Sequence, residues 1–316
     1  MRRAALVTTA LIVFGVLPAA AQAVVLRYAP AQGQSLSYHD VVKTAAISTT
    51  SGAVPVGEKM PPMNSEVTLD TNVAIRVLGT DSKGNHDLEL TVQSGDYSIK
   101  PSWGGTGSEP PLEVQHRPVP KLRYHMKVSS QGEIVEMRSL DASSRESVVV
   151  SFGDFELNGD EYWFFWYTHP LPDKEVGVGD KWATRVRLPT SMLPKGDRPS
   201  APSHLVFNSR LVSLTTLRGH RVAKIHSYVE LPASILLASV PPEQGQGPNW
   251  KMSGQITLSS DWYYDYNQSA VVQNDGTMTV QLNMQVTPPS EEGGGSVGTT
   301  VRGKANSRST LVEQSG

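Results

Sequence analysis

The side chains of this 316-residue sequence that could do chemistry are spread along the chain without a recognisable motif. A zinc site needs three or four converging ligands, and the eight histidines include no His-Glu-x-x-His pair. We find no nucleophile elbow, in which a serine stands on a strand-to-helix turn, and no phosphate-binding glycine loop. A catalytic triad or a pair of catalytic carboxylates whose residues come together only on folding would leave no motif in the sequence. The sequence therefore predicts no metal, no cofactor and no catalytic residue, and leaves a hydrolase of unrecognised type open.

A run of six aromatic side chains, residues 162 to 167, is the strongest candidate for a binding surface. Trp and Tyr join an apolar body to a polar tip, so this run could contact a lipid or a glycan. Large aromatic side chains are also mostly buried, so the run could instead fill a curved sheet as a plug. The candidate ligand-binding residues are Trp163, Phe164, Phe165 and Trp166.

The composition excludes several classes of protein. The chain has no cysteine, so it cannot form disulfides, thiolate metal sites, a cysteine nucleophile or the lipid-bearing cysteine of a lipoprotein. The formal net charge is −2, and it becomes −4 without Arg2 and Arg3. This balance argues against nucleic acid or an anionic membrane as the main partner.

The first 23 residues have the pattern of a secretory signal peptide. Arg2 and Arg3 precede an apolar run from Ala4 to Val16, and small residues stand at Ala21 and Ala23. The apolar run is shorter than the ~20 residues that a membrane-spanning helix needs. We expect a secreted protein of the bacterial periplasm or cell exterior, with no transmembrane segment after cleavage of residues 1–23.

Alternation of apolar and polar residues dominates the remaining chain and predicts β-strands. Every second residue from Val67 to Val77 is apolar or threonine, and residues 278 to 286 show the cleanest alternation. Turn-forming residues with glycine or asparagine separate such segments, because they tolerate the tight backbone of hairpins. We expect hairpin turns at residues 81–85, 131–132, 218–219, 267–269 and 274–276.

The order of these segments recurs in the two halves of the chain. Residues 29–38 and residues 171–182 both place a turn and a glycine before an aromatic residue and an alternating strand. We predict a mainly β fold of two tandem curved antiparallel sheets, each like a half-barrel, with one or two short apolar helices. The expected units are residues 24–170 and 171–316, with a flexible loop at 288–298 and an optional final edge strand at 299–312.

Two segments could form the short helices. Residues 159–167 contain the aromatic run, with Asp160 placed to cap the helix and Pro170 to end it. Residues 232–240 are a second apolar candidate. A sheet curled around a helix would need such apolar inserts.

The segment Leu171-Pro-Asp-Lys-Glu-Val-Gly-Val-Gly-Asp-Lys-Trp182 is the most distinctive motif of the chain. It resembles the Leu-Pro-x-Lys-x-Val-x-Val-Gly-Asp-x-Trp signature of a family of secreted bacterial β-proteins of unknown function. Physically, Pro172 stiffens the approach, Gly179 permits a tight turn, Asp180 can accept hydrogen bonds from turn amides, and Trp182 can anchor a strand. We expect structural duties for these four residues.

The strand pattern is similar, as architecture only, to the half-barrels of periplasmic lipoprotein carriers, which enclose an acyl chain against short helices. This similarity favours an exported, non-catalytic protein that binds an apolar ligand or an envelope protein. The first alternative is a structural or interaction module that acts through its sheet edges and loops. The second is the unrecognised hydrolase.

Overall fold

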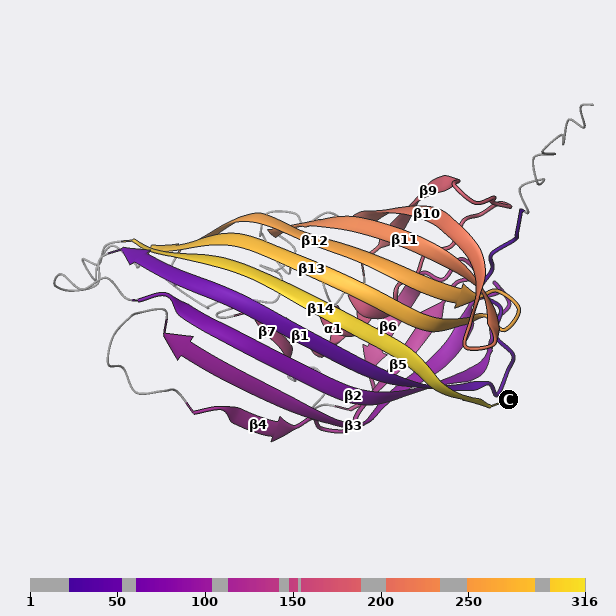
Figure 1. Cartoon of the computed structure of the whole chain (residues 1–316), viewed down its shortest axis with the longest axis horizontal. Helices are drawn as coiled ribbons and strands as arrows, with labels where there is room; N and C mark the ends of the chain where they lie inside the picture. The colour runs from indigo at the N-terminus through magenta and orange to yellow at the C-terminus, as the bar shows by residue number, and fades with distance from the viewer. Residues whose placement is uncertain are drawn as a thin grey trace, which may run out of the picture.

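The fold is built almost wholly from long antiparallel strands (Figure 1). The computed structural model describes residues 23–52, 61–103, 113–141, 148–152, 155–188, 203–233, 249–287 and 296–315. The first half of the described chain supplies β1 (Ser35–Gly52), β2 (Met63–Thr80), β3 (His86–Trp103), β4 (Gln115–Pro118), β5 (Leu122–Val128), β6 (Ile134–Ser139), β7 (Val148–Phe152) and β8 (Phe155–Asn158). The second half follows α1 (Gly159–Tyr167) and supplies β9 (Lys181–Arg187), β10 (His204–Leu217), β11 (His220–Pro232), β12 (Asn249–Asp265), β13 (Ala270–Thr287) and β14 (Val297–Ser315).

Twelve of these strands form one sheet in the order β6-β5-β3-β2-β1-β14-β13-β12-β11-β10-β9, with β4 added beside β3. Each half of the chain contributes one block of neighbouring strands, and the pairing of β1 with β14 joins the two blocks. The sheet curves into a nearly closed, barrel-like shape, in which β7 and α1 lie behind the layer of β12, β13, β14, β1 and β2 (Figure 1). The predicted mainly β fold of curved antiparallel strands with a short apolar helix is confirmed, and the pairing of β1 with β14 joins the two expected sheets into one.

The two blocks share a core. The larger buried cluster combines residues of the first block, such as Leu69 and Leu90, with residues of the second, such as Val229 and Val280, around α1. A smaller cluster lies around Trp262 at the start of the second block. The division into units 24–170 and 171–316 stays a prediction about how the chain is organised.

Most of the expected turns lie between paired strands. The turns at 81–85, 131–132, 218–219 and 267–269 connect β2 to β3, β5 to β6, β10 to β11 and β12 to β13. The turn expected at residues 274–276 is wrong, because Asn274, Asp275 and Gly276 lie inside β13. Gly276 serves close packing instead: a Cβ there would stand 2.7 Å from the Ser307 hydroxyl and 3.2 Å from the Trp166 ring.

The C-terminal segment is more central than the sequence indicates. Residues 299–312 were expected to form an edge strand at most, but β14 pairs with β1 on one side and β13 on the other. Val297 and Gly298, placed in the flexible loop, already belong to β14, and residues 288–295 lie outside the described residues.

Two other expectations fall largely outside the described chain. The signal peptide covers residues 1–23, of which the structure describes only Ala23. The second candidate helix begins at Pro232, which ends β11, and residues 234–240 are not described.

Candidate functional site

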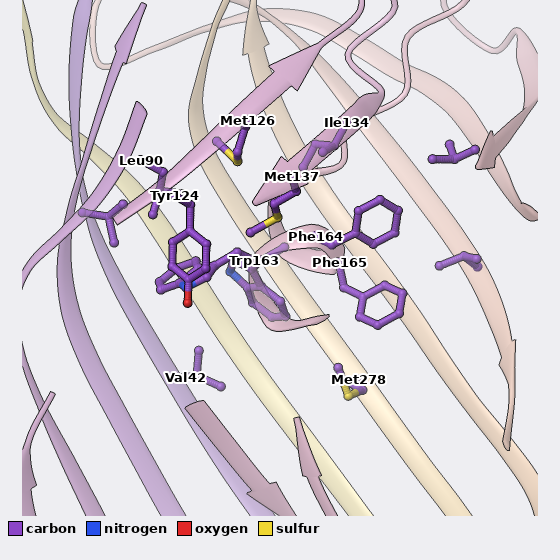
Figure 2. Packing of buried hydrophobic residues seen from close by; sticks show 14 of the residues in the cluster. Val42, Leu90, Tyr124, Met126, Ile134, Met137, Trp163, Phe164, Phe165 and Met278 are labelled. Carbon is purple, nitrogen blue, oxygen red and sulfur yellow. The ribbon is translucent and has the colours of Figure 1, made fainter. Parts of the chain in front are cut away.

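The aromatic run forms α1, and the curved sheet surrounds it. Trp163, Phe164, Phe165 and Trp166 are four successive helical residues, so their side chains point in all directions around the axis, and none is more than 6% exposed. In Figure 2, Trp163 lies beside Tyr124, while the rings of Phe164 and Phe165 point away from that pair. A helix that is apolar on every face is stable only when it is enclosed, and this one is. The aromatic run therefore fills the curved sheet as a plug, which is the second of the two interpretations given to it from the sequence.

The C-terminal end of α1 is fixed to the hairpin between β5 and β6. The backbone N–H of Leu171 donates to the Gln131 carbonyl at 2.7 Å, and the Thr168 N–H and hydroxyl both donate to the Phe164 carbonyl. Gly132 has a φ of 74°, and a Cβ on it would stand 2.3 Å from the His169 carbonyl oxygen. Only glycine allows this approach. The helix ends before Pro170, as expected, whereas the side chain of the expected cap Asp160 lies outside the described residues.

A row of buried polar side chains crosses the inner face of the sheet beside α1. Asp40 of β1 pairs in register with Thr71 of β2 on one side and with Ser309 of β14 on the other. Ser309 pairs in turn with Asn274 of β13. These four strands are neighbours (Figure 1), and the four side chains are at most 5% exposed. We call Thr71, Asp40, Ser309 and Asn274 the polar row.

Asp40 connects the polar row to α1. The Tyr167 hydroxyl donates to Asp40 Oδ2 at 2.8 Å, and Ser309 also forms a hydrogen bond with this carboxyl group. Burial raises the pKa of Asp40 from 3.8 to about 6, although these two hydrogen bonds act in the opposite direction. The carboxyl group is therefore ionised at neutral pH in a largely apolar interior.

Three oxygen atoms of the polar row have no hydrogen-bond partner within the described part of the structure. They are Asp40 Oδ1, Thr71 Oγ1 and Asn274 Oδ1. An unsatisfied buried polar atom costs about 1–3 kcal/mol, and native proteins contain few of them. Other described side chains, such as Thr44 and Ser65, also have an unpartnered oxygen, but Asn274 is the member of the row whose unpartnered oxygen belongs to a residue lining both cavities.

A cavity of about 60 Å³ lies beside the C-terminal end of α1, and of the polar row only Asn274 and Ser309 line it. Its polar side includes Asn274, Ser309 and Tyr167, and its apolar side is formed by Leu36, Ile75, Leu88, Met126, Val128 and Ile134. A second cavity of about 30 Å³ adjoins it and shares Trp166, His169 and Asn274. Burial lowers the pKa of His169 from 6.5 to about 4, so its imidazole is neutral at pH 7. The two cavities therefore offer apolar walls and uncharged or acceptor groups.

The structure brings only part of the expected binding residues to this space. Trp166 lines both cavities and Phe165 lines the smaller one, whereas Trp163 and Phe164 are packed in the core. Sequence reasoning missed Asp40 and Asn274. One signal was present: each stands at an inward position of its strand, between apolar residues such as Tyr38 and Val42.

The four motif residues have structural positions outside the two cavities. Asp180 Oδ2 accepts a hydrogen bond from the Gly177 amide at 2.9 Å, and Gly179 has a φ of 99°, as the turn requires. Trp182 is only half-buried, but its indole N–H donates to the Pro170 carbonyl at 3.3 Å. Pro172 is buried. The motif thus links the end of α1 to the start of β9.

Two arrangements among the described residues resemble parts of a hydrolase site, but each differs from one in its structural setting. His220 Nδ1 lies 2.9 Å from Asp265 Oδ2, but Asp265 also accepts hydrogen bonds from the Asn267 and Gln268 amides and so holds the turn after β12. Ser296 stands in a Gly-x-Ser-x-Gly string at residues 294–298, yet a strand follows it rather than the helix of a nucleophile elbow. No three His, Asp or Glu side chains of the described residues gather as a metal site would need.

Comparisons with known proteins give little further definition. No family model matches the chain, and no curated protein matches it. One similar solved structure concerns lipid–protein interactions in lipovitellin, with 9% sequence identity and a TM-score of 0.42. The match covers 91% of this chain and 26% of the lipovitellin chain, so this chain spans about a quarter of that protein. A likeness at this level carries no functional conclusion. Within the described ranges, no helix is both long and apolar enough to cross a membrane.

Proposed function

We propose that this protein is an exported, non-catalytic binding protein that holds an apolar ligand inside its curved sheet, against α1. The observation that carries the proposal is the apolar cavity beside Trp166, which has a polar side formed by Asn274 and Ser309. Ligand sites in proteins are typically apolar hollows with a few polar groups that fix orientation. Export and the absence of catalysis are the expectations from the sequence.

The size of the cavity sets a condition on binding. A space of about 60 Å³ holds roughly two water molecules, whereas sites for drug-sized ligands measure roughly 300–1,000 Å³. Binding therefore requires the Trp166 side chain or the whole of α1 to shift. Such a shift is feasible, because β7 and β8 pair only with each other among the described strands, and α1 is not part of the large sheet. The two cavities would then join across Trp166.

A neutral fluorescent probe, N-phenyl-1-naphthylamine, tests the proposal on the full mature chain. We expect saturable binding with one site and energy transfer from tryptophan to the probe. Ala270 lines the larger cavity and is 1% exposed, so Ala270→Leu should fill the space and weaken binding at least tenfold. Ala183→Leu is the matched control, because Ala183 is exposed on β9.

Two results would count against an internal site. Binding that is not saturable would leave no ligand site and would favour the alternative, a module acting through its sheet edges. Equal binding by both leucine variants would place the probe elsewhere on the protein. Mass spectrometry of lipids that copurify from the native host would then identify the natural ligand.

A further inference from the structure

We infer that the polar end of the ligand is an uncharged hydrogen-bond donor, a hydroxyl group above all, and that Asn274, the member of the polar row that lines both cavities, receives it. This inference rests on the proposed function, because it names the class of ligand for the same site. The ligand would be a small amphiphile with an apolar body and one hydroxyl at its end.

The first reason is that every unpartnered atom of the polar row is an oxygen that can accept a hydrogen bond. Asp40 Oδ1 and Asn274 Oδ1 are acceptors only, and Thr71 Oγ1 can accept as well as donate. The two groups that approach Asp40, the Tyr167 and Ser309 hydroxyls, already bind the carboxyl group. Of the three unpartnered atoms, Asn274 Oδ1 belongs to the side chain that lines the cavities, and it lacks a donor.

The second reason is the position of Asn274. Its side chain is 5% exposed and lines both cavities, opposite the apolar wall formed by Leu88 and Met126. A molecule lying between them would meet hydrocarbon at one end and a carboxamide oxygen at the other. This arrangement orients an amphiphile with its polar end toward β13 and β14.

The third reason is the absence of positive charge around this space. Neither cavity has a lysine or arginine among its lining residues in the described chain, and burial keeps the pKa of His169 low enough for a neutral ring. A carboxylate or phosphate head beside Asn274 would have no cation to bind among the lining residues. Burying an unpaired charge is costly, so these heads are disfavoured.

Competition with the bound naphthylamine probe tests this inference at pH 8, where Asp40 is ionised. The competitors are 1-octanol, its isomer heptyl methyl ether, and octanoate. The ether has the same atoms but no O–H donor, and octanoate carries a negative charge. We expect 1-octanol to compete about tenfold more strongly than either, since one buried hydrogen bond contributes about 1–1.5 kcal/mol.

Variants of the polar row should remove this preference. Asn274→Leu takes away the carboxamide, so octanol affinity should fall about tenfold while ether affinity stays the same or rises. Asn283→Leu is the matched control, because Asn283 is exposed on the same strand. Asn274→Ala, with Asn283→Ala as its control, gives a second pair of variants should Asn274→Leu fail to fold.

The outcomes separate the two proposals. Failure of the probe itself to bind would overturn the proposed function and this inference with it. Probe binding with octanoate or the ether competing as well as octanol would overturn only the inference. An octanol preference that survives Asn274→Leu, or Asn274→Ala in its place, would also overturn it, because the donor would then be received elsewhere.

Discussion

Two buried regions of the same sheet treat their polar groups in opposite ways. Around Trp262, the indole N–H donates to the Ser227 hydroxyl at 2.9 Å, Ser227 is 2.8 Å from Ser209, and the Tyr264 hydroxyl donates to the Arg27 carbonyl. Beside α1, the polar row leaves three oxygens without partners in the described structure. The chain can satisfy buried groups where only folding requires it. Among the unpartnered oxygens beside α1, that of Asn274 belongs to a residue lining both cavities and is therefore the candidate for contact with a ligand.

The comparison also shows that a distinctive sequence motif need not mark the candidate site. The motif of residues 171–182 is the most recognisable segment, and it lies in the region where polar groups are paired. The polar row is unremarkable in sequence, yet its members Asn274 and Ser309 line the larger of the two cavities. His169 joins the regions, because its ring packs against Trp262 with centroids 4.9 Å apart and lines both cavities.

The largest effect on stability is expected around Trp262, where the buried polar groups have hydrogen-bond partners. Trp262 is fully buried, so Trp262→Ala should lower the free energy of unfolding by about 3–5 kcal/mol, through lost burial and a cavity. It also leaves Ser227 without its donor. Urea denaturation measures the loss, and a loss below about 2 kcal/mol would contradict the tight packing of this region.

Replacement of Asp40, in contrast, should raise the free energy of unfolding. Its pKa is about 6 in the folded state and 3.8 in the unfolded chain, so between pH 4 and 6 only the folded state keeps the proton. The free energy of unfolding therefore falls as pH rises through this window, by about 3 kcal/mol. Asp40→Asn should be more stable than the parent by up to that amount at pH 8 and equally stable at pH 4. An unchanged stability at pH 8 would show that Asp40 carries no burial cost.

The titration of His169 should change the free energy of unfolding in the direction opposite to that of Asp40, over nearly the same range of pH. Its pKa is about 4 in the folded state and 6.5 in the unfolded chain, so the unfolded state takes up a proton first as the pH falls. Stability then decreases from pH 6.5 to 4, by about 2 kcal/mol because the ring is partly exposed. The parent should show a nearly flat profile, and Asp40→Asn should expose the acid-side loss. His169→Gln should remove that loss, as thermal denaturation at a series of pH values would show.

Much of the fold could be predicted because its signals are local. Alternation marks β2 from Val67 to Val77, and short turn signals separate most hairpins. The central place of β14 could not be predicted, since its partner β1 lies over 200 residues away and leaves no local trace. Gly276 was misread as a turn because glycine serves close packing against Trp166 just as it serves a tight turn.

The candidate site was predicted only in part, for a related reason. The aromatic run identified α1, but which of its residues reach the cavity depends on the helical direction of each side chain. In the sequence, a single inward-facing polar residue such as Asp40 looks only like an interruption of the alternation between apolar and polar residues. Only the register of four strands shows that it belongs to a row.

The smallest effect tests how firmly α1 is held beside the polar row. Gly132 and Gly84 both have positive φ, 74° and 81°, but a Cβ at Gly132 would meet the His169 carbonyl while a Cβ at Gly84 meets nothing. Gly84→Ala should therefore cost about 1 kcal/mol from backbone strain alone. Gly132→Ala should cost roughly 1 kcal/mol more, because the end of α1 must also move. If α1 shifts during binding, Gly132→Ala should in addition strengthen naphthylamine binding, since it loosens the same attachment. If the two variants lose equal stability, the contact between Gly132 and His169 can shift without a cost in free energy. The end of α1 would then not oppose ligand entry.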